Sequence, residues 1–139
     1  MLTRRLFATC ALCAVTGFIA TDANAQAGAP ATFASPGLKR TILQQSEGPM
    51  EGYMTIIAQV EIEPGAMIAR HTHPGIESGY VVQGGGDFSV QGQANRQAKP
   101  GDGFQVTANT PHSFKNGDTA TKLAVTFVVE KGKPLASPA

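Results

Sequence analysis

The sequence predicts an all-β domain, either a sandwich or a barrel, with little or no helix. Short segments rich in β-branched and aromatic residues recur along the chain, and clusters of Gly, Pro, Asn and Asp separate them. Short strands spaced about eight to twelve residues apart, with turns between them, are typical of sandwiches and barrels. No stretch has a helical period long enough to predict a helix. We expect the strands to pair sequentially and antiparallel.

The predicted strands share β-forming residues and a turn signal at one or both ends. They cover residues 40–45, 53–63, 79–83, 87–91, 103–106 and 123–129.

Residues 1–25 are predicted to be an export signal. Arg4 and Arg5 give a basic start, residues 6–20 form an apolar run, and a small-residue cleavage site ends at Ala25. The mature chain is therefore expected to be periplasmic or secreted. The arginine pair fits the twin-arginine type of signal and also the general secretory route, so the export route stays open.

The rest of the chain is long enough for one domain. Residues 26–38 are rich in Ala, Gly, Pro and Ser, which predicts a flexible leader. Residues 39–131 hold the predicted strands and are expected to form the domain. Residues 132–139 have a composition like the leader's and predict a loose C-terminal tail.

Cysteine content and charge narrow the range of partners. Cys10 and Cys13 both lie in the signal, so the mature chain has no thiol for a disulfide or a metal. Without Arg4, Arg5 and Asp22 the chain keeps nine basic and nine acidic residues, and these are not clustered. We therefore expect neither nucleic-acid binding nor a membrane anchor, and a small molecule as the partner.

Histidine is scarce in this chain, and its positions are informative. His71 and His73 are one residue apart, Glu77 follows, and His112 is the third and last histidine. Because side chains alternate along a strand, His71 and His73 should face the same side. Two imidazoles and a carboxylate suit a divalent ion with open coordination positions, and His112 could complete the set. The alternative is that they are hydrogen-bonded interior histidines.

The spacing of these residues resembles a motif of a known family. The pattern Gly65-x5-His71-x-His73-x3-Glu77-x6-Gly84 matches the first motif of the cupin superfamily at every defined position. This motif is specific, because five residues of fixed type must coincide at fixed spacing.

A second cupin motif is matched in part. Gly101, His112 and Asn116 have the spacing of that motif, while Thr107 and Asn109 stand where the family has Pro and Gly. The two departures concern a turn, so they put its local geometry in doubt more than the set of ligands.

The resemblance, which runs from about residue 40 to residue 131, implies a small single-domain bacterial cupin. Such a protein is a cupin β-barrel of the double-stranded β-helix or jelly-roll type. The motif implies His71, His73, Glu77 and His112 as ligands of one divalent metal. Nitrogen and oxygen donors without sulfur suit Mn, Fe, Ni, Cu, Co or Zn, and the sequence does not choose among them.

Three further residues are candidates for the pocket. Gln105 interrupts an apolar segment and could line the pocket, or it could face outward. Tyr80 and Phe104 could line it too, or simply pack in the core.

The resemblance leaves the activity open, because one fold hosts many functions. We expect a metal-dependent, dioxygenase-like oxidoreductase that acts on a small oxygen-donor substrate. The alternatives are a metal-dependent lyase or isomerase working through an enolate, and a non-catalytic module that binds metal or a small ligand. The sequence shows no obvious base beside the four ligands, which is the weak point of any catalytic reading.

A homodimer is also expected. The predicted strand at residues 40–45 comes first in the domain and could form an exposed sheet edge, which can pair with a second chain.

Overall fold

The described part of the chain consists of strands and the turns between them. The computed structural model describes residues 32–139; the expected export signal, residues 1–25, and residues 26–31 of the expected leader lie outside this range. Within residues 32–139 there are eleven β-strands and no helix, so no helix there is able to cross a membrane. The predicted all-β class is confirmed.

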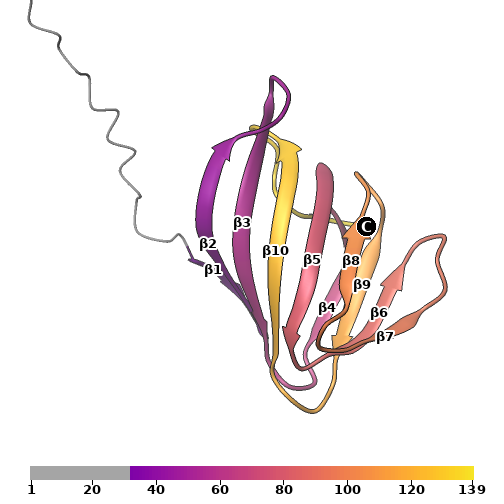
Figure 1. Cartoon of the computed structure of the whole chain (residues 1–139). Coiled ribbons are helices and arrows are strands. Elements are labelled where there is room, and N and C mark those ends of the chain that lie inside the picture. The colour runs from indigo at the N-terminus through magenta and orange to yellow at the C-terminus, as the bar shows by residue number, and fades with distance from the viewer. Residues whose placement is uncertain (1–31) are drawn as a thin grey trace, which may run out of the picture.

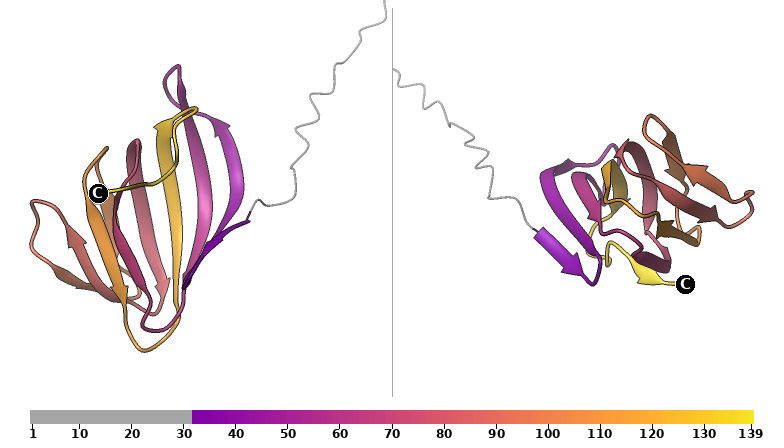
Figure 2. Two further views of the ribbon diagram at one scale, coloured as in Figure 1. Left: turned by 180° about the vertical axis from the view of Figure 1, so that it is seen from behind. Right: turned by 90° about the horizontal axis from the view of Figure 1, so that it is seen from below.

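The strands form two antiparallel sheets that face each other and converge at one end (Figures 1 and 2). The six-stranded sheet contains, in spatial order, β1 (Thr32–Ser35), β2 (Leu38–Glu47), β3 (Tyr53–Ile62), β10 (Thr121–Glu130), β5 (Gly75–Gln83) and β8 (Gly103–Val106). The five-stranded sheet contains β11 (Ser137–Pro138), β4 (Met67–Thr72), β9 (His112–Asn116), β6 (Gly86–Val90) and β7 (Arg96–Ala98).

The expectation of sequential pairing is wrong for most of these strands. β10 lies between β3 and β5, and β9 lies between β4 and β6. The reason is that the turns at Pro64-Gly65, Pro74 and Gly84-Gly85 do not close hairpins within one sheet. They carry the chain from one sheet to the other, so that consecutive strands contribute to opposite walls of one core.

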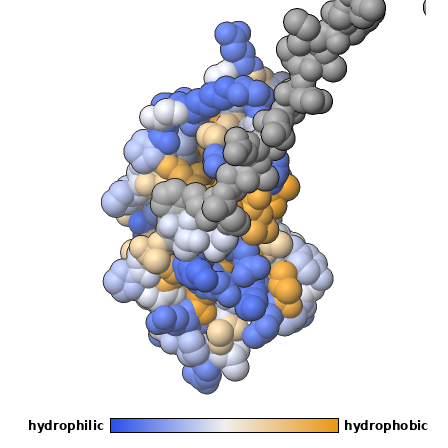
Figure 3. Space-filling view, turned by 90° about the vertical axis from the view of Figure 1, so that its left-hand side faces the viewer, coloured by the Kyte–Doolittle hydropathy of each residue, from blue (hydrophilic) through white to orange (hydrophobic). Residues whose placement is uncertain are grey.

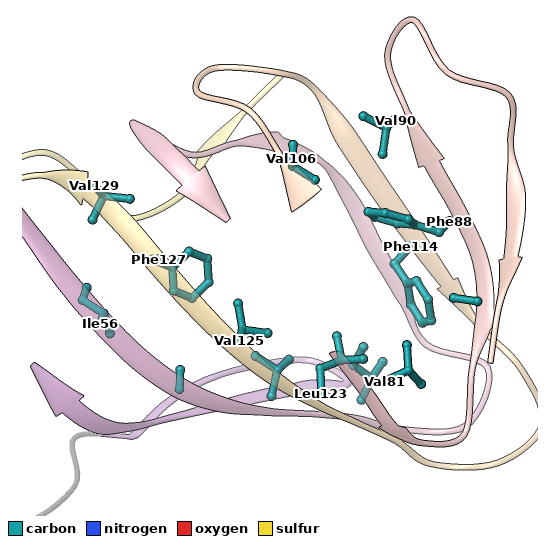
Figure 4. Packing of buried hydrophobic residues seen from close by; sticks show 14 of the residues in the cluster. Ile56, Val81, Phe88, Val90, Val106, Phe114, Leu123, Val125, Phe127 and Val129 are labelled. Atoms are coloured by element: carbon teal, nitrogen blue, oxygen red, sulfur yellow. The ribbon is translucent and has the colours of Figure 1, made fainter. Parts of the chain in front are cut away.

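The core fills the space between the two sheets (Figure 4). β10 alternates strictly, so Leu123, Val125, Phe127 and Val129 point inward, and Phe127 is fully buried. Burying an aliphatic or aromatic side chain of this size stabilises the fold by about 1.5–3 kcal/mol. On the side that β2 borders, hydrophobic areas of the surface alternate with hydrophilic ones (Figure 3).

Both ends of the described chain are more ordered than the composition predicts. Residues 32–35 of the expected leader form β1, which pairs with the first residues of β2 up to Thr41. The expected loose tail contains β11, in which Ser137 lies opposite Thr72 of β4. Both short strands cover sheet edges whose backbone groups would otherwise lack partners. The predicted edge strand at residues 40–45 is therefore an edge only beyond Thr41, within the described residues.

The buried side-chain amide of Asn116 links the turns at the narrow end of the barrel, where the two sheets converge. The Asn116 Nδ2 atom donates to the carbonyls of Ile62, Glu63 and Thr119 at 3.1, 2.7 and 2.9 Å. Its Oδ1 accepts a hydrogen bond from the Thr121 hydroxyl at 2.5 Å. Asn116, which matches the last position of the second motif, is therefore a structural residue that joins β3, β9 and β10.

We expect Asn116→Ala to lower the free energy of unfolding by about 2–4 kcal/mol, because it leaves buried carbonyls and a hydroxyl without partners. Urea unfolding followed by circular dichroism measures this loss. The control is Lys115→Ala, one residue away and exposed, which should change stability by less than about 0.5 kcal/mol. Equal effects of the two substitutions would contradict the structural role of Asn116.

Candidate metal centre

The strand pairing brings the four motif residues from both sheets to one place. His71 lies near the end of β4, directly opposite His112, the first residue of β9. His73 follows two residues after His71 and faces the same side, as the alternation predicts. The Pro74 turn then carries the chain into the other sheet, where Glu77 lies in β5 opposite Phe127 of β10.

The three imidazoles and the carboxylate converge inside the barrel. One ring nitrogen from each of His71, His73 and His112 lies within 4.8 Å of the others. The Glu77 Oε2 atom lies 3.2 Å from the His73 Nε2 and 3.1 Å from the His112 Nε2. His73, Glu77 and His112 are buried, and His71 is half-buried.

Each imidazole is held through its other ring nitrogen by a backbone carbonyl. The Nδ1 atoms of His71, His73 and His112 lie 2.8, 2.5 and 2.9 Å from carbonyl oxygens of Ala69, Leu135 and Thr110, in that order. A carbonyl oxygen only accepts hydrogen bonds, so each Nδ1 must carry the proton. In the neutral tautomer each Nε2 then presents a lone pair to the centre, and carbonyl partners of this kind are what orient metal-binding histidines.

This arrangement fits a cation. The Nε2 atoms of His73 and His112 are buried and have no hydrogen-bond partner among the described residues. Their contacts with Glu77 therefore set nitrogen lone pairs against an anionic oxygen, unless a proton or a metal ion lies between them. A buried group of acceptors without donors is unfavourable, and a metal ion at this point would satisfy all of them. The three histidines can thus hold a metal ion.

The charge states follow from burial and from the contacts with Glu77. Burial lowers the pKa of His71 to about 4, although Glu77 and a backbone carbonyl act in the opposite direction. Burial acts to raise the pKa of Glu77, but its close contacts with the imidazoles of His112 and His73 outweigh it and lower the pKa to about 2. Burial acts to lower the pKa of His112, but its close contact with Glu77 and its hydrogen bond to a backbone carbonyl raise that pKa. Near neutral pH the centre therefore holds a carboxylate at Glu77 and a neutral His71.

The turn before His112, where two residues depart from the motif, is held by hydrogen bonds. Asn109 has a φ of 56°, in the left-handed region that favours glycine, and Asn is among the residues that tolerate it. The backbone N–H of Asn109 donates to the carbonyl of His73 at 2.9 Å. The Thr107 and Thr110 hydroxyls are hydrogen-bonded at 2.9 Å. The departures from the family pattern are therefore compatible with the geometry of the turn.

A largely apolar cavity of about 50 Å³ adjoins the centre; this volume is the space open to the centres of water molecules. About 10–15 Å³ of such volume holds one water, so the cavity accommodates a few waters or a molecule of a few heavy atoms. Its polar lining residues are Arg40, His71, Glu77 and His112, and its apolar ones include Val60, Ile68, Val81, Phe88, Phe104 and Phe114.

The three candidate pocket residues have different locations. Phe104 lines the cavity and packs against Phe88, with ring centroids 5.1 Å apart. Gln105, the next residue in β8, lies on the outer face, where its Nε2 donates to the Ser78 hydroxyl at 3.0 Å. Tyr80 is 51% exposed and does not line the cavity. Because side chains alternate along β8, Phe104 faces the cavity and Gln105 faces outward.

Sequence reasoning missed two contributions to this site. Arg40 lines the cavity because it lies on the inner face of β2 with Leu38 and Ile42. The alternation of that strand could have predicted the position of Arg40. The Leu135 carbonyl, which holds His73, lies in the C-terminal segment, 62 residues away. No local pattern in the sequence predicts this contact.

Comparison with known proteins decides the family. A family profile described as "Cupin domain" matches residues 58–129, just over half of the chain. The chain belongs to the cupin family. The expected fold and family are thereby confirmed, and the profile spans all four candidate ligands.

Solved structures share this cupin fold at low sequence identity. An RmlC-like cupin from Shewanella frigidimarina is 23% identical, with a TM-score of 0.62 over 74% of this chain and 86% of that one. The DMSP lyase DddQ from Ruegeria pomeroyi is 19% identical, with a TM-score of 0.57 over 68% and 44%. Oxalate decarboxylase from B. subtilis is 14% identical, with a TM-score of 0.66 over 79% and 30%. No protein of curated function shows significant similarity to the chain.

We expect zinc affinity to fall as the pH is lowered from about 8 to about 5. A raised pKa keeps His112 protonated to higher pH, so protons compete with the metal at that residue first. His71, with a pKa of about 4, stays neutral across this range. Competition titrations at a series of pH values measure the effect. An affinity that does not change with pH would show that no histidine is a ligand.

Truncation after Pro134 should weaken zinc binding by about 10–100-fold, because it removes the carbonyl that orients His73. Truncation after Ala136 is the matched control, since it removes β11 but keeps Leu135. Affinity and melting temperature are measured for both. Equal zinc affinity in the two truncated chains would contradict a role for Leu135.

Proposed function

We propose that this protein is a metal-dependent enzyme that acts on a small oxygen-donor substrate. One divalent transition metal ion would be held by the Nε2 atoms of His71, His73 and His112, with Glu77 as the fourth ligand. The observation that carries this proposal is the convergence of buried lone pairs without donors beside an apolar cavity. Hydrogen-bonded interior histidines would instead have partners at both ring nitrogens.

When bound, such an ion would supply Lewis acidity and, for a redox-active metal, electron transfer. Three nitrogens and one oxygen would suit Mn, Fe, Ni, Cu, Co or Zn. The identity of the metal is therefore a matter for measurement.

The chain's own residues would position the substrate and exclude water. The aromatic rings of Phe88, Phe104 and Phe114 line the cavity and limit its size. His73 is fixed by the Leu135 carbonyl and packs against Phe127, with ring centroids 5.0 Å apart. A largely apolar site of this kind would favour orientation and electrostatic stabilisation of a substrate of a few heavy atoms.

The preferred reaction is a dioxygenase-like oxidation, for which a redox-active metal ion held by the four proposed ligands would supply electron transfer. It is supported by the lining of the cavity, where the described residues offer no carboxylate or imidazole beyond the four ligands. An elimination or isomerisation would need a separate base, or Glu77 would have to act as one.

A lyase is the second candidate. It is supported by two of the proteins with a similar fold, which are described as a DMSP lyase and an oxalate decarboxylase. Both are less than 25% identical to this chain and much longer than it, so they favour the reaction class only as an analogy.

We also infer that the enzyme works in the periplasm or outside the cell. The inference rests on the signal-like residues 1–25, with cleavage near Ala25.

The test measures metal content, oxygen uptake and product formation with small enediols and phenols, using the mature protein from its native compartment. We expect one metal ion per chain and oxygen uptake that falls at least about 100-fold in His73→Ala and Glu77→Gln, because each variant removes a ligand. Gln105→Ala, on the outer face, is the control and should be unaffected. Product formation without oxygen uptake would favour the lyase, and tightly bound metal without turnover of any substrate would contradict both enzymes.

A further inference from the structure

The cavity contains a charged residue that the metal centre does not use. Arg40 lies in β2, opposite Val60 of β3, and its side chain lines the cavity together with His71 and Glu77. Its guanidinium carbon lies 5.5 Å from the centroid of the Phe127 ring, which is fully buried. The half-buried side chain therefore reaches from the surface into the barrel.

Part of this guanidinium is buried without a hydrogen-bond partner. Its Nε atom is buried and has no hydrogen-bond partner among residues 32–139. Burial lowers the pKa of Arg40, and Glu77 opposes this only through its charge, without forming an ion pair. The Phe127 ring attracts the positive charge, but it offers the buried Nε–H no oxygen acceptor. A buried N–H without an acceptor is unfavourable, so a ligand that accepts a hydrogen bond from this guanidinium would be favoured here.

The charge of the interior also favours an anion. Glu77 and Arg40 balance each other, because one carries a negative and the other a positive charge. A divalent ion at the three histidines would then leave two positive charges in excess within an apolar cavity. An anionic ligand reduces this excess, and its attraction is strong where the dielectric constant is low.

The size and the shape of the site select a carboxylate among anions. Guanidinium presents its donors as a planar fork, which matches the two oxygens of a carboxylate. A cavity of about 50 Å³ holds only a few heavy atoms, and its other walls are apolar. The matching ligand is a short carboxylic acid whose remaining atoms are apolar or carry one further oxygen.

A surface groove provides access to Arg40. It has a volume of about 320 Å³ and runs between the start of β2, the end of β4 and the C-terminal residues 136–138. Leu38, Arg40, Ile68 and His71 line both the groove and the cavity. A ligand that enters through the groove therefore meets Arg40 and His71 at the junction of the two.

We propose that Arg40 is the specificity-determining residue of this site and binds the carboxylate of a small monocarboxylic substrate, which reaches the metal centre through the groove. This deepens the proposed function and rests on it for the role of the metal. Arg40 would fix one end of the substrate, so that an oxygen at the other end faces the three histidines.

The probe for this proposal is propionate, with propionamide as a neutral molecule of the same shape. Both are titrated into the metal-free and the zinc-loaded protein, and the guanidinium signals of Arg40 are followed by nuclear magnetic resonance. Zinc is redox-inactive, so the measurement reports binding and not turnover. Propionate should shift the Arg40 signals, and propionamide should bind at least tenfold more weakly.

Variants isolate the guanidinium. Arg40→Met should weaken propionate binding at least tenfold, and Arg40→Lys should give an intermediate loss because it keeps the charge but not the planar fork. Arg96→Met is the matched control: its guanidinium carbon also lies 5.5 Å from a ring centroid, that of Phe88, but the side chain is exposed and does not line the cavity. It should bind propionate as the wild type does.

The outcomes separate this proposal from the proposed function. Zinc retained by Arg40→Met with propionate binding unchanged would overturn the role of Arg40 and leave the metal site standing. Arg40-dependent propionate binding in a protein that does not bind zinc would support Arg40 and overturn the metal centre. Equal binding of propionate and propionamide would overturn the carboxylate specificity.

Discussion

One electrostatic constraint governs the centre of the barrel: hydrogen-bond acceptors lie buried there without donors. Backbone carbonyls fix the Nδ1 atoms of His71, His73 and His112, and the Nε2 atoms then face one another and the Glu77 carboxylate. Burial prevents water from relieving this arrangement at His73 and His112. Only a proton or a cation can satisfy these acceptors, and strands from both sheets bring them together.

The fold meets this constraint by taking the acceptors from both sheets. β4 and β9 supply His71 and His112 from one wall, and β5 supplies Glu77 from the other. The C-terminal segment closes the arrangement through Leu135. Because the Asn116 network ties β3, β9 and β10 at the narrow end, the two walls are held in register. The site is therefore a consequence of closing the sheets on each other, and not of any single loop.

The sequence predicts the local part of this picture well. Strand alternation places His71 and His73 on one side, and the Pro74 turn brings the chain to Glu77. Phe104 and Gln105 are both pocket candidates from the sequence, and the structure places only Phe104 at the cavity. The sequence does not predict which strands pair, because turns of the same composition either close a hairpin or cross between sheets. The docking of the tail through Leu135 is likewise missed, since it depends on backbone groups far apart in the chain. The sequence also does not show that the Nε atom of Arg40 lacks a hydrogen-bond partner among the described residues, because this depends on how the neighbouring strands pack.

The most direct test of the central claim is anomalous X-ray diffraction from crystals of the mature protein grown with cobalt. The account predicts a single strong peak per chain, within coordination distance of the Nε2 atoms of all three histidines and of a Glu77 oxygen. No peak at this point, with the His73 and His112 nitrogens instead hydrogen-bonded to Glu77 or to water, would contradict it.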